Sequence, residues 1–150
     1  MQLISIDFTS VIILLAGLCA YIAFLITQQE TLKAIQPQNR LIAPVMIWLQ
    51  LIPIFQLGYQ FIVVTKISNS IKKEIASWQS DSILGFENAQ SVEILRTRPT
   101  HEIGIAYCVM LCFSIFPVIG NFAAIAFLIC WILYWVKLNE YKRMIQLRRT

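Results

Sequence analysis

One uncharged run in this chain is too long to cross a membrane a single time. From Ile103 to Val136 the sequence contains no Asp, Glu, Lys, Arg or His. As one α-helix these residues would extend about 51 Å, whereas the hydrocarbon core of a bilayer is about 30 Å thick. The run must therefore turn, and three of its residues favour turns: Pro117, Gly120 and Asn121. We predict a tight helical hairpin formed by residues 103–117 and 121–137.

Two further apolar runs, residues 8–26 and 41–65, precede this hairpin and carry no charged side chains. Each is long enough for one membrane crossing, although Pro53 must kink or break a helix inside the second run. No Lys or Arg precedes the first run, so we expect a retained anchor and not a cleaved signal peptide.

The composition excludes an ordinary soluble domain. Of 150 residues, 58% are hydrophobic and 13% are charged, and the mean hydropathy is +0.69. Soluble domains carry roughly 25% charged residues, and a soluble chain of this length could not hide so much apolar surface. We therefore predict an all-α integral membrane protein, with residues 1–150 forming a single bundle of four transmembrane helices.

Polar and small residues inside the apolar runs are candidates for contacts between helices. An amide in hydrocarbon needs a hydrogen-bond partner, so we expect the glutamines of the second run to point at other helices. Lining a substrate path is the alternative role. Small residues let a neighbouring helix approach closely. The candidate interhelical residues are Gln50, Gln56, Gln60, Asn121, Ala16 and Ala20.

A segment that follows the second run has the pattern of an amphipathic helix. Its apolar stripe consists of Ile67, Ile71, Ile75 and Trp78. The stripe would either lie in the lipid headgroup region or pack against the polar end of the bundle, and the sequence favours neither. The basic tail, residues 138–150, is predicted to lie at the membrane surface or to dock a partner. Its candidate residues are Lys142, Arg143, Arg148 and Arg149.

The distribution of basic residues predicts a topology. Lys and Arg number 2 in residues 27–40, 5 in residues 66–102 and 5 from residue 137 to the end, with none before residue 8 or in the hairpin turn. With four crossings, the positive-inside rule places loop 66–102 and both termini in the cytoplasm. In a rival arrangement, runs 41–65 and 103–136 are both re-entrant and only the first helix crosses. We prefer four crossings, because about 25 residues cover one crossing well and two poorly.

The sequence contains no recognisable chemical site. Its four cysteines (Cys19, Cys108, Cys112 and Cys130) lie in apolar stretches and are best explained as small buried side chains. The neighbouring pair His101 and Glu102 is explained by capping charges at the start of a helix. We therefore expect no catalytic residue, cofactor or metal ion, and no enzymatic activity. Nucleic-acid binding is not expected, because the predicted topology accounts for the net charge of +4.

Two parts of the chain resemble a known family. The first part contains Asn39-Arg40, Pro44, Trp48-Leu49, Leu51-Ile52-Pro53 and the run from Gln60 to Val64. The second contains Gly104 to Cys108, Pro117, Gly120, Ile129 to Ile132 and Tyr134 to Lys137. These residues resemble an uncharacterised family of small bacterial multi-span inner-membrane proteins, from which the chain departs at Gln56 to Tyr59. The resemblance implies a bacterial inner (plasma) membrane protein and carries no activity or functional residue.

Two functions are consistent with these observations. The first is an accessory or interaction subunit in the lipid bilayer, which docks a protein partner through its packing faces or its basic tail. The alternative is a small homo-oligomeric transporter or channel lined by the polar residues of the spans.

Overall fold

The computed structural model describes residues 8–81, 100–116 and 120–149, and all regular secondary structure in them is helical. The long helices are α1 (Phe8–Ala34), α2 (Pro53–Asp81) and α5 (Gly120–Arg149), and α4 (His101–Phe113) is shorter. Two 3-10 helices, η1 (Pro37–Asn39) and η2 (Pro44–Leu51), connect α1 to α2. The all-α prediction is confirmed for the described residues.

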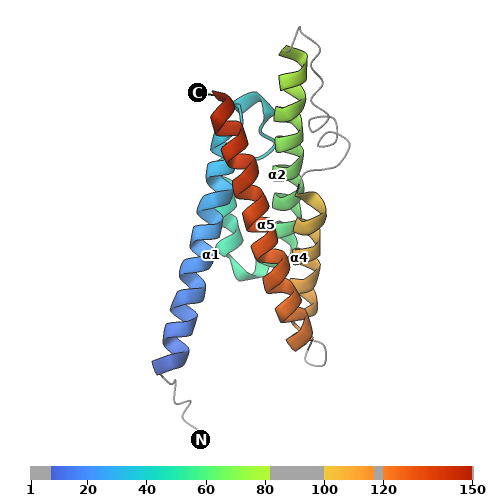
Figure 1. Cartoon of the computed structure of the whole chain (residues 1–150). Helices are drawn as coiled ribbons and strands as arrows, with labels where there is room; N and C mark the ends of the chain where they lie inside the picture. Colours follow the sequence, from blue (N-terminus) through green and yellow to red (C-terminus); the bar gives the residue numbers. More distant parts are fainter. Residues whose placement is uncertain (1–7, 82–99, 117–119, 150) are drawn as a thin grey trace, which may run out of the picture.

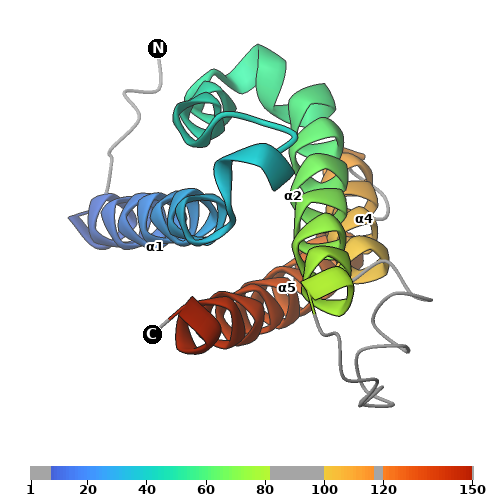
Figure 2. The same cartoon turned by 90° about the horizontal axis from the view of Figure 1, so that it is seen from above.

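The helices form an elongated bundle in which α1, α2 and α5 run in one direction and α4 runs back (Figure 1). Seen from above, α1, η2, α2 with α4, and α5 surround a common core (Figure 2). Helix α5 packs on α1 and α4, and α2 packs on α4 and η2. Because α1 and α5 run in the same direction, the start of α1 and the end of α5 lie at opposite ends of the molecule (Figure 1). The four-span prediction, in contrast, placed both termini on one side.

The predicted second span, residues 41–65, does not form one helix. The 3-10 helix η2 ends at Leu51, the backbone of the next residue, Ile52, is extended (φ −83°, ψ 112°), and α2 begins at Pro53. The proline explains the break, because its ring disfavours the helical conformation for the residue before it. The chain reverses direction there, so that η2 and α2 lie side by side as two arms (Figure 1). The break predicted at Pro53 is therefore observed, but the two parts fold back on each other and do not form the single span that the sequence analysis preferred.

The helical hairpin predicted over residues 103–137 is present as α4 and α5, which pack against each other. Gly120 is the first residue of α5, and a side chain would be crowded there: a Cβ atom would lie 2.9 Å from the carbonyl oxygen of Ser114. Pro117 lies outside the described residues. Helix α5 continues without a break through the predicted basic tail.

Charged and apolar residues separate along the length of the bundle. The charged residues of α1, α2 and α5 lie in the C-terminal portion of each helix, and Glu102 lies in the first turn of α4. Because α4 runs opposite to the other three, these portions gather toward one end, which we call the charged end (Figure 1). The other end, the apolar end, consists of the N-terminal half of α1 and the turns of two hairpins: the first hairpin is η2 with α2, and the second is α4 with α5.

Among the described residues, two helices are long and apolar enough to cross a membrane: Phe8–Ala34 and Gly120–Arg148. Four transmembrane helices are therefore not observed. The apolar part of α4 is shorter, and α2 combines a short apolar part with a charged one.

The core lies toward the charged end and includes the stripe that follows the second apolar run. Ile67 and Ile71 are fully buried and Ile75 is 2% exposed, while Trp78 packs against the core and is half-buried. The three isoleucines therefore contact other parts of the bundle, which agrees with the second of the two alternatives that the sequence left open and not with a position at the membrane surface. An amphipathic pattern identifies the face of a helix that is covered, not the molecule that covers it.

Candidate functional site

The glutamines of the second apolar run meet α1 in a buried polar cluster, which we call the glutamine cluster. Gln50 in η2 donates from Nε2 to Oε1 of Gln28 over 2.8 Å, and neither side chain is accessible to solvent. Gln56 in α2 donates to the hydroxyl of Tyr21 over 3.2 Å, and Gln60 lies near that hydroxyl. The cluster therefore joins α1, η2 and α2.

Tyr21 is the centre of this cluster. Its hydroxyl donates to the carbonyl oxygen of Gln50 over 3.2 Å. In this way one phenol from α1 is held by residues from both arms of the first hairpin. The cluster is not fully paired, because Nε2 of Gln28 and the Oε1 atoms of Gln50 and Gln60 are buried without a hydrogen-bond partner. Since unpaired buried amides are unfavourable, these atoms mark a polar centre inside an otherwise apolar region.

The other predicted interhelical residues lie apart from this cluster. Asn121 is exposed in the first turn of α5, at the apolar end. Ala16 is also exposed, and Ala20 is half-buried. A Cβ atom built on the neighbouring Gly17 would meet no atom within 4 Å. This face of α1 is therefore open, and the described residues of the chain do not pack on it.

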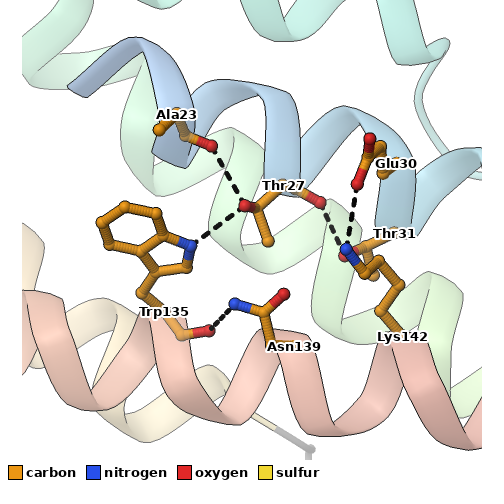
Figure 3. A network of polar contacts seen from close by, with 7 residues as sticks. All are labelled: Ala23, Thr27, Glu30, Thr31, Trp135, Asn139 and Lys142. Carbon is orange, nitrogen blue, oxygen red and sulfur yellow. Dashed lines mark hydrogen bonds and ion pairs between the residues drawn. The ribbon is translucent and has the colours of Figure 1, made fainter. Parts of the chain in front are cut away.

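Helix α5 is fastened to α1 by a line of polar contacts (Figure 3). The indole nitrogen of Trp135 donates to Oγ1 of Thr27 over 3.0 Å, and that hydroxyl donates in turn to the carbonyl oxygen of Ala23. Further toward the C-terminal ends of both helices, Nζ of Lys142 in α5 pairs with Glu30 in α1 over 2.9 Å. These contacts fix the register of the two helices that are long enough to cross a membrane.

A second polar group, at the charged end, fixes the turn between α1 and α2. Glu74 is 1% exposed, and its Oε2 accepts hydrogen bonds from the Asn39 amide (2.7 Å) and from the backbone N–H of Gln36 (3.1 Å). The other oxygen, Oε1, is buried without a partner. The hydroxyl of Ser70 accepts from the backbone N–H of Leu41 over 2.9 Å. Thus one face of α2 holds both η1 and the residues that follow it.

The end of α1 has its own side-chain cap. Arg40 donates from Nε to the carbonyl oxygen of Ile35 over 2.8 Å and from a terminal nitrogen to that of Lys33 over 2.9 Å. The last carbonyl groups of a helix lack intrahelical partners, and a cation placed there also complements the helix dipole.

The basic tail packs on the bundle at several points. Arg148 lies over the ring of Trp78 at 4.7 Å from its centroid, and Lys142 forms the ion pair with Glu30. Burial raises the pKa of the Tyr141 hydroxyl. Arg143 is exposed, and the side chain of Arg149 lies outside the described residues. Two of the four basic residues predicted to lie at the membrane surface therefore contact other residues of the chain.

The centre of the core is aromatic, and the sequence analysis did not identify it. The ring of Phe24 lies 5.4 to 6.2 Å from four rings that belong to α4 and α5: Tyr107, Trp131, Tyr134 and Trp135. These separations are typical of favourable aromatic pairs. The missed signal was the i, i+3, i+4 spacing of the three aromatic residues of α5, which defines one helix face.

The described residues contain no group of three or more His, Cys, Asp or Glu side chains placed to hold a metal ion. All four cysteines are free thiols. Cys108 is buried as predicted, but Cys19 is exposed on the open half of α1. The described residues therefore form contacts that join helices, and they leave one face of α1 open.

No family model, curated protein or solved structure matches this chain.

Proposed function

We propose that the protein is embedded in the bacterial plasma membrane and serves as an accessory subunit that docks a transmembrane helix of a partner. The docking surface would be the N-terminal half of α1 around Ala16 and Gly17. The observation that carries the proposal is the open face at Gly17, where an added Cβ atom meets nothing within 4 Å. Glycine and alanine at such a position allow close helix approach, which stabilises helix association in lipid.

The exposure of the long apolar helices supports the membrane location. Only 11% of the most apolar window of α1 and 17% of that of α5 are buried within the structure. The core helix of a soluble protein would be mostly buried, so these surfaces need an apolar solvent. A cleaved signal sequence is disfavoured as an explanation of α1, because Phe24 and Gln28 are fully buried in the core.

The internal contacts reduce the number of surfaces left for a partner. The sequence suggested three: the glutamines, the basic tail and the small residues of α1. Gln50 and Gln60 are 0% and 2% exposed and Gln56 is half-buried, so little of the glutamine cluster is accessible to a partner. The tail packs on α1 and α2 through Lys142 and Arg148. The small-residue face of α1 is the surface that the described residues leave open.

The test is native extraction in mild detergent, followed by determination of the mass and composition of the particles. Stoichiometric partner polypeptides are expected with the unaltered protein. They should be lost with the double substitution Ala16→Leu and Gly17→Leu, which fills the open face without touching the core. Leu18→Phe is the control, because it enlarges an exposed side chain at a similar depth on the opposite face of α1. Retention of the partner by the double variant, or purification of the unaltered protein as a lone monomer, would refute the docking proposal.

A transporter remains the second candidate because the glutamine cluster contains three unpaired amide atoms in an apolar region. Its predicted lining included Asn121, which is exposed at the apolar end and does not join the cluster. A homo-oligomer with no other polypeptide attached would favour transport. Solute flux in liposomes should then disappear with Gln56→Leu combined with Gln60→Leu, and absence of flux from the unaltered protein would exclude this function.

A further inference from the structure

The two hairpins share an arrangement that bears on how the chain sits in a bilayer. The first hairpin consists of η2 and the apolar part of α2, and the second consists of α4 and the apolar part of α5. Each starts near the charged end, turns at the apolar end and returns (Figure 1). Helix α1, in contrast, extends past the turn of the first hairpin and diverges from α5 toward the apolar end in both views (Figures 1 and 2).

The lengths of the uncharged helical segments differ in a way that matches this arrangement. In α1 the uncharged part is Phe8–Gln29, which covers about 33 Å at 1.5 Å per residue and therefore spans a core of about 30 Å. In α2 it is Pro53–Thr65, about 20 Å, and α4 as a whole is also about 20 Å long. In α5 the uncharged part is 120–136, about 26 Å. The uncharged part of α2 and the whole of α4 are thus well short of the hydrocarbon core, unlike α1, and α5 reaches it only when residues from Lys137 onward are counted.

The exposed side chains at the two turns favour a hydrocarbon environment over water. The turn of the first hairpin presents Ile52 and Phe55 at 43% and 62% exposure, and that of the second presents Ile115 and Phe116 at 63% and 59%. A turn that emerged into water would leave these large apolar side chains exposed to it. Among the described residues there is no charged side chain within either turn.

Several described backbone N–H groups at these turns are hydrogen-bonded within the chain, which a lipid environment favours. In the first hairpin, the N–H of Ile52 donates to Leu49 (3.2 Å) and that of Gln56 donates to Ile52 (2.9 Å). In the second, the N–H of Ser114 donates to Met110 over 2.9 Å, and its hydroxyl donates to Leu111 over 2.7 Å.

We propose that both hairpins enter and leave the bilayer through the cytoplasmic leaflet, with their turns ending among the acyl chains, and that α1 alone crosses. This inference rests on the membrane location proposed above. All 12 Lys and Arg residues then lie on the cytoplasmic side, as the positive-inside rule favours. The surface of the two turns contacts lipid acyl chains, and the N-terminal end of α1 faces the opposite side.

Lys33 allows a test on the unaltered protein, because four complete crossings would place it outside the cell. The probe is a membrane-impermeant amine reagent, applied to intact expressing bacteria and to opened membranes, with the modified lysines identified by mass spectrometry. Lys33 and Lys66 are both exposed, and Lys66 is the control because both topologies place it inside. Modification of both only after opening supports the inference, whereas modification of Lys33 in intact cells overturns it.

The turns themselves are tested by single cysteines in a chain whose four native cysteines are replaced by alanine. Ile52→Cys and Ile115→Cys should resist a membrane-impermeant maleimide in intact and in opened cells, and should react after detergent. Lys73→Cys should react on opening, and Phe8→Cys should react in intact cells. Reaction of either turn cysteine before detergent, from whichever side, overturns the inference.

The two proposals fail in different ways. If alkaline carbonate releases the protein from membranes, the membrane location itself is wrong. If the protein stays in the membrane while a turn cysteine reacts, only the hairpin inference is wrong. Should the cysteine-free chain fail to accumulate, the amine experiment on the unaltered protein still decides, because it needs no substitution.

Discussion

The side-chain amide of Asn39 donates a 2.7 Å hydrogen bond to the Glu74 carboxylate, although 35 positions separate the two residues. This contact joins the η1 turn to the C-terminal part of α2, at the charged end of the bundle. The same carboxylate oxygen accepts the backbone N–H of Gln36. One buried acidic side chain therefore fixes where the chain turns after α1, and so where the first hairpin begins.

Replacing Asn39 with alanine is expected to lower the free energy of unfolding by about 1–3 kcal/mol, because hydrogen bonds to charged groups contribute about that much and Glu74 would lose its side-chain donor. The measurement is thermal or denaturant unfolding of the purified protein in detergent. Gln38→Ala is the control: its exposed hydrogen bond to Gln36 should change stability by less than about 0.5 kcal/mol. Equal stability of the two variants would show that the contact with Glu74 does not hold the turn.

The buried amide pair Gln28 and Gln50 gives a second prediction. Gln50→Leu should lower stability by about 1–2 kcal/mol, because the Gln28 carbonyl oxygen would remain buried without its 2.8 Å donor. Replacing both glutamines with leucine should recover much of that loss, since no unpaired amide then remains in the pair. Asn121→Leu is the matched amide control at an exposed position and should be nearly neutral. If the double variant is less stable than the Gln50→Leu variant, the two glutamines stabilise the bundle by more than the one hydrogen bond between them.

The sequence predicted helices well where length and covalent geometry decide the structure. An uncharged run longer than a bilayer must turn, and the α4–α5 hairpin follows from that. Pro53 had to disrupt a helix, and it does. The return of η2 alongside α2 belonged only to the rival arrangement with a re-entrant run 41–65, which was not preferred, because a proline identifies the break and not the new direction of the chain. That direction depends on contacts of η2 with α1 and α2, which connect residues distant in the sequence.

The polar residues of the candidate site were predicted only in part for a related reason. Gln50, Gln56 and Gln60 stood out because they interrupt an apolar run. Gln28 did not, because it lies in what the sequence suggested was a polar connection after residue 26. In the structure α1 continues to Ala34, which carries Gln28 into the bundle opposite Gln50. Glu74 was not predicted to be buried, because it lies off the apolar stripe of its helix, although residues 35 to 38 positions earlier in the chain donate hydrogen bonds to it.

Gly104 provides the prediction that most directly tests the packing of the bundle. A Cβ atom there would collide with Cγ1 of Val64 and would lie 2.9 Å from Cε2 of Tyr134. The absence of a side chain therefore lets α4 approach α2 and α5 at once. Gly104→Ala should lower the free energy of unfolding by about 1–3 kcal/mol, because both neighbours are fully buried and cannot move aside freely.

Gly58→Ala, in α2, is the matched comparison because its Cβ atom would meet nothing within 4 Å. Alanine is the better helix former, so this variant should be more stable by up to about 1 kcal/mol. The two substitutions add the same methyl group inside a helix, and thermal unfolding in the same detergent should move in opposite directions. If Gly104→Ala also gains stability, α4 does not approach Val64 and Tyr134 as closely as the structure places it, and the second hairpin packs differently against α2.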